Sequence, residues 1–159
     1  MTIGSLLAAR DAAAVGEAPA AEAAIHCARA AEPLSAVVAR LAEHRIGAMP
    51  VLAEAGSVGD AGEVIGVISE RDVVLCLDAR GTSALDAPVS DAMTSPAVTI
   101  TLDTPVLVAL SLMTRRRIRH LPVVEGGRMV GFVSIGDLVK FRIQRIEAEA
   151  AALRDYIAS

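Results

Sequence analysis

The sequence predicts an α+β fold in which two β-α-β-β-α repeats pack sheet to sheet with pseudo-two-fold symmetry, followed by a long C-terminal helix. One observation behind this is a pattern of Gly, two apolar residues, Ser, two further residues and Asp, found at 66–72 and again at 131–137. Another is that a shift of 72 positions superimposes the segments upstream of that pattern, placing Pro33 on Pro105. Such self-similarity indicates a repeat architecture, with sites expected between the repeats.

Each repeat is expected to contain an amphipathic helix that starts at a Pro, over 33–44 in the first and 104–116 in the second. A strand hairpin and a second helix follow in each repeat. The predicted hairpin strands cover residues 46–52, 64–68, 118–124 and 129–133. Repeats of roughly 60 residues are small for independent stability, so the two are expected to share a core.

The remaining segments connect or extend the repeats. Residues 2–10 resemble a short helix, residues 11–24 an Ala-rich loop or frayed helix, and residues 53–63 an exposed hairpin loop rich in Gly, Ala and Asp. We therefore divide the chain into a first repeat over 1–86, a second repeat over 87–145 and a C-terminal helix extension over 146–159.

Apolar residues in the last segment follow the alternating spacing of a coiled-coil seam. They are Val139, Ile143, Ile146, Ala150, Leu153 and Ile157. A helix from Asp137 to Ile157 is about 30 Å long at a rise of about 1.5 Å per residue, which is longer than one repeat needs. It either folds back on its own module or mediates a homodimer, and we favour the homodimer.

Composition excludes several classes of protein. The net charge of −4 and an aromatic content of 2% disfavour a nucleic-acid binder. No apolar run reaches the roughly 18 residues of a membrane span, and the first residues lack the basic region of a signal peptide. The two cysteines, Cys27 and Cys76, lie far apart, which fits a reducing cytoplasm.

The repeated pattern places a Ser and an Asp where a buried strand meets a helix. A helix start offers free backbone N–H groups and the positive end of a dipole, so it suits an anion. The same spacing is also close to a capping box, which needs no ligand. Because the pattern occurs twice within matching repeats, we favour a binding role for Ser69 with Asp72 and for Ser134 with Asp137.

At this point the chain resembles a tandem pair of CBS domains (a Bateman module), the family named for cystathionine β-synthase. The resemblance rests on Arg-Ile-Gly-Ala-Met-Pro-Val at 45–51 and Arg-Ile-Arg-His-Leu-Pro-Val at 117–123, each followed by its Gly-x-x-Ser-x-x-Asp. It covers about residues 2–145. The family implies a regulatory protein that binds an adenosine-containing ligand, AMP, ADP or ATP above all, in clefts between the repeats.

The resemblance also implies two clefts, each with an Asp that accepts hydrogen bonds from ribose hydroxyls and a Ser that helps to hold phosphate. The cleft of Asp72 and Ser69 would include Val67, Arg71, Val98, Ile100, Arg119 and His120. The cleft of Asp137 and Ser134 would include Phe132, Gly136, Cys27, Ala28, Ile46, Gly47 and Ala48. Only the first set adds basic groups that can meet a phosphate, Arg71, Arg119 and His120, so we expect a phosphorylated nucleotide to prefer it.

No catalytic constellation, metal-ligand spacing or phosphate-binding glycine motif is evident in the sequence. We therefore expect a cytoplasmic regulatory module, not an enzyme, that requires no cofactor or metal and signals to an unidentified effector protein by a change of conformation. Two alternatives stay open. One is a ligand-free dimerisation scaffold whose clefts have decayed, and the other is an accessory protein related to the regulatory insert of inosine-monophosphate dehydrogenase.

Overall fold

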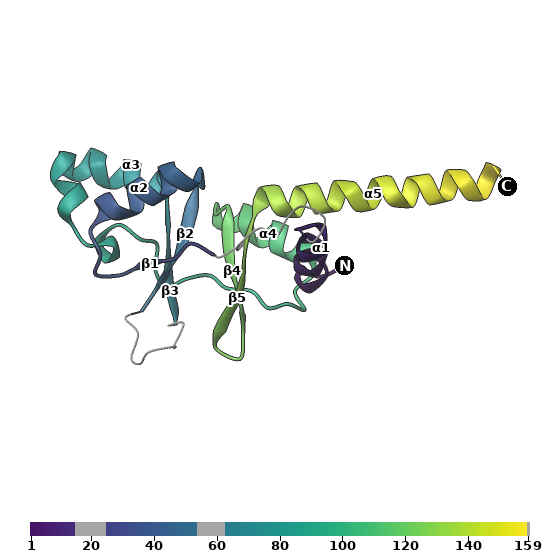
Figure 1. Cartoon of the computed structure of the whole chain (residues 1–159), viewed down its shortest axis with the longest axis horizontal. Helices are drawn as coiled ribbons and strands as arrows, with labels where there is room; N and C mark the ends of the chain where they lie inside the picture. Colours follow the sequence, from purple (N-terminus) through teal and green to yellow (C-terminus); the bar gives the residue numbers. More distant parts are fainter. Residues whose placement is uncertain (15–24, 54–62, 159) are drawn as a thin grey trace.

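The computed structural model describes residues 1–14, 25–53 and 63–158. Two small sheets lie side by side in the middle of the molecule, with helices on their outer sides (Figure 1). The strands of the first sheet are β1 (Ala28–Arg29), β2 (Ala48–Leu52) and β3 (Val64–Ser69), and those of the second are β4 (His120–Glu125) and β5 (Arg128–Ser134). The arrangement confirms the predicted α+β fold.

The helices follow the repeat order. Helices α2 (Leu34–His44) and α3 (Glu70–Arg80) belong to the first repeat, and α4 (Val106–Arg116) and α5 (Ile135–Ala158) to the second. As predicted, a Pro with extended backbone stands directly before α2 and before α4, because its fixed φ and missing N–H suit a helix start. Two short 3₁₀ turns, at Gly81–Asp86 and Val89–Asp91, connect the repeats.

The backbone repeats in detail. Arg45 ends α2 and Arg117 ends α4, both in the left-handed conformation with φ of 52° and 54°. The N–H of Glu70 donates to the Gly47 carbonyl at 3.0 Å, and the N–H of Ile135 donates to the Arg119 carbonyl at 2.8 Å. Each of these pairs joins the start of the second helix to the start of the hairpin, so both helix starts are held in the same way.

The opening strand differs between the repeats. In the first it is β1, which pairs in parallel with β2. In the second it is reduced to a single parallel bridge between Ile100 and Val123, with the N–H of Ile100 donating to the Pro122 carbonyl at 3.0 Å.

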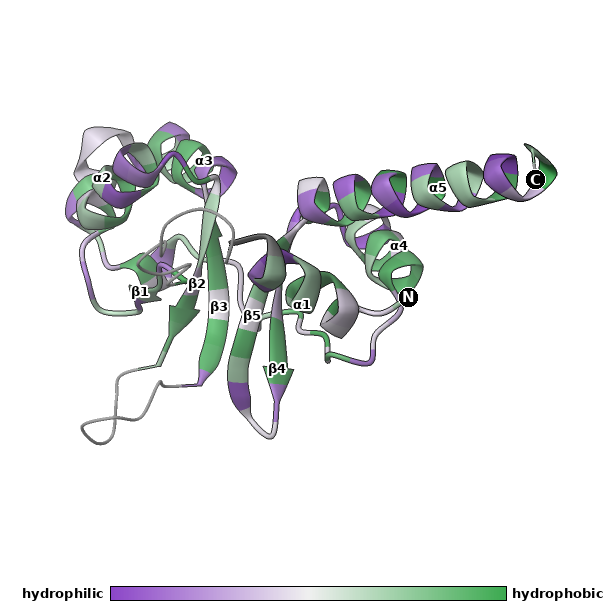
Figure 2. Ribbon diagram, turned by 45° about the vertical axis from the view of Figure 1, so that its right-hand side comes forward, coloured by the Kyte–Doolittle hydropathy of each residue, from purple (hydrophilic) through white to green (hydrophobic). Residues whose placement is uncertain are grey.

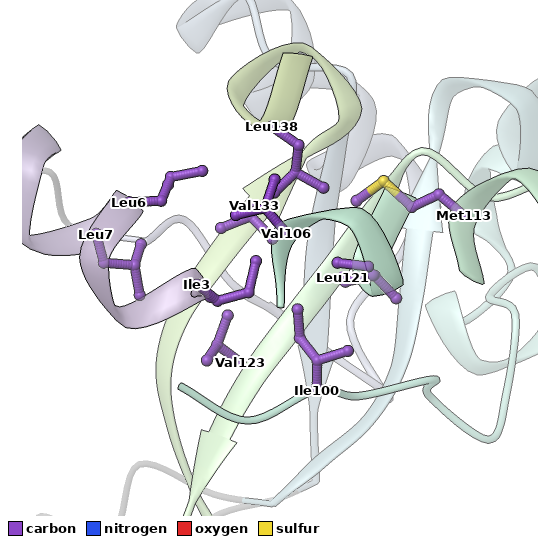
Figure 3. Close-up of a cluster of buried hydrophobic side chains, with 11 residues drawn as sticks. Ile3, Leu6, Leu7, Ile100, Val106, Met113, Leu121, Val123, Val133 and Leu138 are labelled. Atoms are coloured by element: carbon purple, nitrogen blue, oxygen red, sulfur yellow. The ribbon is translucent and has the colours of Figure 1, made fainter. Parts of the chain in front are cut away.

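The two hydrophobic cores exchange segments across the predicted boundary at residue 86. Helix α1 (Ile3–Ala14) inserts Ile3, Leu6 and Leu7 into the core of the second repeat (Figure 3). The core of the first repeat in turn includes Val89, from the 3₁₀ turn beyond that boundary. Each repeat is therefore completed by the segment that precedes the other one in the chain.

The connecting segments are described in part. The short helix expected over 2–10 extends to Ala14, and the rest of the Ala-rich stretch, 15–24, lies outside the described residues. The N–H of Ala53 donates to the Glu63 carbonyl at 2.8 Å and closes the base of the hairpin loop, whose residues 54–62 also lie outside them. The predicted C-terminal extension is the far end of α5, which is continuous to Ala158.

Candidate functional site

The end of β3 and the start of α3 fix the position of Asp72. The hydroxyl of Ser69 accepts the Asp72 N–H at 3.3 Å, while Oδ2 of Asp72 accepts the N–H and the hydroxyl of Ser69 at 2.8 and 2.6 Å. This is a complete capping box. The other oxygen, Oδ1, accepts only the hydroxyl of the exposed Thr94, at 3.2 Å, among the hydrogen bonds of the described residues.

The second copy of the motif has the same geometry. Oδ2 of Asp137 accepts the N–H and the hydroxyl of Ser134 at 2.7 and 2.8 Å, and the Ser134 hydroxyl accepts the Asp137 N–H at 3.1 Å. The capping role considered for the sequence pattern is therefore present in both repeats. It does not exclude a binding role, because each carboxylate keeps a second oxygen with lone pairs to accept further donors.

A cavity of about 720 Å³ opens beside Asp72, within the size range of small-molecule sites. Both repeats line it, so a molecule bound there would touch both. From the first repeat come Gly47, Val67, Ser69, Glu70, Arg71, Asp72 and Leu75. From the linker and the second repeat come Thr94, Pro96, Ala97, Val98, Arg116, Arg117, Ile118, Arg119 and His120.

Four arginines give this cavity its electrostatic character. Arg71 comes from the first turn of α3, and Arg116, Arg117 and Arg119 come from the end of α4 and the approach to β4. All four side chains are exposed, and none forms a salt bridge within the described residues. Since only two carboxylates share the lining, the cavity favours an anion, and guanidinium groups match phosphate oxygens in geometry.

His120 lies half-buried at the cavity, with its ring stacked on Phe132 at a centroid distance of 5.6 Å. Burial lowers the pKa of His120 below its usual value; Asp137 and Glu70 oppose the change and Arg119 adds to it. Burial therefore favours the neutral form of this imidazole. A Cβ built on Gly47 would lie 3.7 Å from the His120 ring, so this glycine leaves space beside it.

The structure brings together most of the residues predicted for one of the two clefts. Seven residues predicted for the Asp72 cleft line the cavity together, namely Val67, Ser69, Arg71, Asp72, Val98, Arg119 and His120. The placement of Ile100 needs correction, because its bridge to Val123 buries its side chain in the core of the second repeat. Gly47, assigned by the resemblance to the other cleft, belongs to this one.

Apart from Gly47, the residues predicted for the Asp137 cleft do not line this cavity. Ala28 and Ile46 belong to the first core or pack on it, and Ala48 is buried. The ring of Phe132 stacks on that of His120. The carbonyl of Phe132 accepts a hydrogen bond from Nη1 of Arg10 at 3.5 Å. The cleft beside Asp137 therefore stays a prediction.

Several lining residues were not predicted. Arg116 was predicted only as the last residue of the helix over 104–116. Thr94, Pro96 and Ala97 belong to the linker, which has no repeated motif. Arg117 is part of the repeated Arg-Ile motif, where it matches Arg45 of the first repeat. This match was the feature of the sequence that could have placed Arg117 near the site.

The described residues support neither a metal site nor a membrane-spanning helix. Within 1–14, 25–53 and 63–158, no group of three or more His, Cys, Asp or Glu side chains is placed to hold a metal ion. The same ranges contain no helix with the length and apolar character needed to cross a membrane.

Comparison with known proteins identifies the family. The profile of the CBS domain matches residues 20–79 and again residues 89–143. The chain belongs to the CBS-domain family. Two CBS domains in tandem are what the repeated motifs predicted, and this confirms the resemblance.

Similar proteins extend from plants to archaea. The chain is 36% identical over 122 residues to the mitochondrial CBS domain-containing protein CBSX3 of Arabidopsis thaliana, covering 76% of this chain and 57% of that protein. It is 30% identical to the CBS domain-containing protein YhcV of Bacillus subtilis, covering 69% and 72%. The chain thus spans little more than half the length of the first curated relatives it matches.

Solved structures share the fold. The CBS-domain protein ATU1752 of Agrobacterium tumefaciens superimposes with a TM-score of 0.71 at 29% identity, covering 89% of this chain and 92% of that one. The CBS domain protein PAE2072 of Pyrobaculum aerophilum, solved in complex with AMP, superimposes with a TM-score of 0.66 at 27% identity, covering 86% and 89%.

Proposed function

We propose that this CBS pair is a regulatory module that binds an adenosine nucleotide (AMP, ADP or ATP) in the cavity beside Asp72. The observation that carries the proposal is that one cavity lined by both repeats brings together a fixed carboxylate and four arginines that form no salt bridge within 1–14, 25–53 and 63–158. Oδ1 of Asp72 is available to a ribose hydroxyl once the exposed Thr94 hydroxyl turns away. The AMP complex of the 27% identical PAE2072 supports this choice of ligand.

We assign the phosphate mainly to the arginines and not to the start of α3. The Glu70 N–H already donates to Gly47, and the Asp72 N–H donates to Ser69. Two of the first three N–H groups of the helix are thus engaged, which leaves little of the free helix start that an anion would use. The phosphate can instead be bound by the guanidinium groups that line the cavity, those of Arg71, Arg116, Arg117 and Arg119.

The proposed output is conformational. A nucleotide that touches both repeats biases the pair toward the geometry that it binds best, because a ligand shifts only states for which its affinity differs. No covalent step is part of this proposal. We propose that a separate effector protein in the cytoplasm reads the change and that the module is a homodimer.

A ligand-free scaffold is the second candidate, and a specific observation favours it. Both Ser-x-x-Asp pairs form the reciprocal hydrogen bonds of a helix cap, so the motif has a structural reason to exist without any nucleotide. The two candidates differ in one measurable respect, which is whether the chain binds an adenosine nucleotide at all.

Calorimetric titration of AMP, ADP and ATP into matched variants tests the proposal. Asp72→Ala and Asp137→Ala remove equivalent caps, so both should lose a similar stability of about 0.5–2 kcal/mol. Only Asp72→Ala loses a group at the cavity, and we expect it to weaken AMP binding by about tenfold or more, or about 1.4 kcal/mol.

Equal losses of affinity in the two variants would refute the preference for the Asp72 cavity. If no adenosine nucleotide binds the unchanged chain, the scaffold is the better description.

A further inference from the structure

Helix α5 carries an apolar stripe that its own module leaves exposed. The helix extends far beyond the second repeat, and apolar and polar residues alternate along it (Figures 1 and 2). The exposed fractions of Ile143, Ile146, Leu153 and Ile157 are 50%, 48%, 62% and 81%. Leu138 and Phe141, by contrast, face the core. The alternative considered above, in which the helix folds back on its own module, is therefore not what the structure shows, and the stripe is open to a partner.

The stripe has the residue spacing of a coiled coil. We name it the α5 seam; its residues are Val139, Ile143, Ile146, Ala150, Leu153 and Ile157. In heptad notation Ile143, Ala150 and Ile157 occupy a positions, and Val139, Ile146 and Leu153 occupy d positions. Ile at a with Leu at d, the combination that favours two strands, is present at Ile157 and Leu153, while the other d positions carry the β-branched Val139 and Ile146.

The charges beside the α5 seam distinguish a parallel from an antiparallel pair. Arg142 and Glu149 occupy g positions, and Glu147 and Arg154 occupy e positions, with all but the half-buried Arg142 exposed. Within the part of the chain that the structure describes, none of the four forms a salt bridge. In a parallel pair each g residue faces the e residue five positions later on the other helix. Arg142 then meets Glu147, and Glu149 meets Arg154, so every such contact joins opposite charges.

An antiparallel pair that keeps the same apolar layers would bring like charges together. Glu147 then faces Glu147 of the second copy, Glu149 faces Glu149, and Lys140 faces Arg154. Each of these contacts joins like charges, which destabilise a pair when they face each other.

We propose that the α5 seam binds the α5 seam of a second copy of this chain, side by side and parallel, as a two-stranded coiled coil. This deepens the proposed homodimer by naming its surface and orientation, and it does not depend on nucleotide binding. The seam from Val139 to Ile157 extends about 28 Å at about 1.5 Å per residue. A parallel pair places both modules at the same end of the coil, related by a two-fold axis along it.

Sedimentation equilibrium of the full chain tests whether the α5 seam is the interface. We expect twice the chain mass of 16.4 kDa for the unchanged protein at about 50–100 μM, a range typical of weak to moderate association. Ile146→Glu should give the monomer mass. Ala148→Glu, an exposed position on the opposite side of the helix, adds the same charge and should leave the dimer intact. A monomeric or trimeric unchanged chain, or a dimer that survives Ile146→Glu, would overturn the proposal.

A charge exchange tests the orientation. The double variant Glu147→Arg with Arg154→Glu keeps the composition and net charge but puts like charges together in a parallel pair, so the dimer should dissociate at least tenfold more readily. Adding Arg142→Glu and Glu149→Arg restores every opposite-charge contact and should restore the dimer. An antiparallel pair predicts no loss in the first variant, because Lys140 then faces Glu at position 154, and that result would overturn the parallel arrangement.

Discussion

His120 is the residue whose protonation should report the approach of a phosphate. Burial lowers its pKa in the free protein, so the folded state favours the neutral imidazole. Its contribution to stability is present above the ordinary histidine pKa of about 6.5 and is lost as the pH falls from there toward the lowered value. A nucleotide phosphate beside the ring would favour the imidazolium and raise the pKa.

AMP binding at pH 6.5 should therefore take up protons at His120. Calorimetry in buffers with different ionisation enthalpies measures this uptake, which we expect to be a fraction of a proton up to about one per AMP. His120→Gln is the control, because it retains the proton balance of the nucleotide's own phosphate. Equal uptake in the two proteins would mean that the phosphate does not reach His120.

Individual residues also show what the sequence could and could not predict about the site. The repeated Ser-x-x-Asp and Arg-Ile motifs led to Asp72, Arg119 and His120, because motif positions fix the ends of strands and helices. Ile100 was misplaced, since which face an extended segment turns inward depends on the strand it pairs with. Thr94 could not be predicted, because it reaches the site through a bridge to Val67.

At the scale of elements, a segment from elsewhere in the chain packs closely against the second strand of each hairpin. A Cβ built on Gly66 in β3 would lie 2.8 Å from Sδ of Met93 and 2.9 Å from the Thr94 carbonyl. A Cβ built on Gly131 in β5 would lie 2.7 Å from Cδ1 of Leu7. Both positions need glycine for space, but the neighbours differ in how easily they can move.

Gly66→Ala should destabilise the protein more than Gly131→Ala does. The Thr94 carbonyl is backbone and accepts the Val67 N–H at 3.0 Å, whereas the tip of Leu7 can turn within α1. We expect Gly66→Ala to cost about 1–3 kcal/mol in urea unfolding, as overpacking commonly does. The matched Gly131→Ala should cost less, and a cost equal to or above that of Gly66→Ala would contradict this account.

Helices and strands were predicted well where a periodic pattern was long or bounded by Pro and Gly. Helices α2 and α4 begin next to their prolines, and the second hairpin turns at Gly126 and Gly127, both with positive φ. The destination of α1 could not be predicted. Its apolar residues indicate that it packs on something, but only the tertiary structure shows that it completes the second repeat.

The exchange of segments has a consequence for the whole molecule, because each core includes a segment that precedes the other repeat in the chain. Helix α1 fills the second core, while the first core takes Val89 from the segment before the second repeat. Each repeat alone is also near the lower size limit for independent folding. The two should therefore unfold together in one cooperative transition.

Scanning calorimetry of core variants tests this cooperativity. Met49→Ala removes a fully buried side chain from the first core and Leu121→Ala one from the second, each at a cost of about 2–5 kcal/mol. At about 2–4 °C per kcal/mol for a chain of this size, either change should lower one common Tm by roughly 4–20 °C, with equal calorimetric and van't Hoff enthalpies. The exposed Val74→Ala should shift it little. A variant whose calorimetric trace shows two transitions would mean that the repeats unfold separately despite the exchanged segments. A nucleotide bound between the repeats would then stabilise each of them to a different extent.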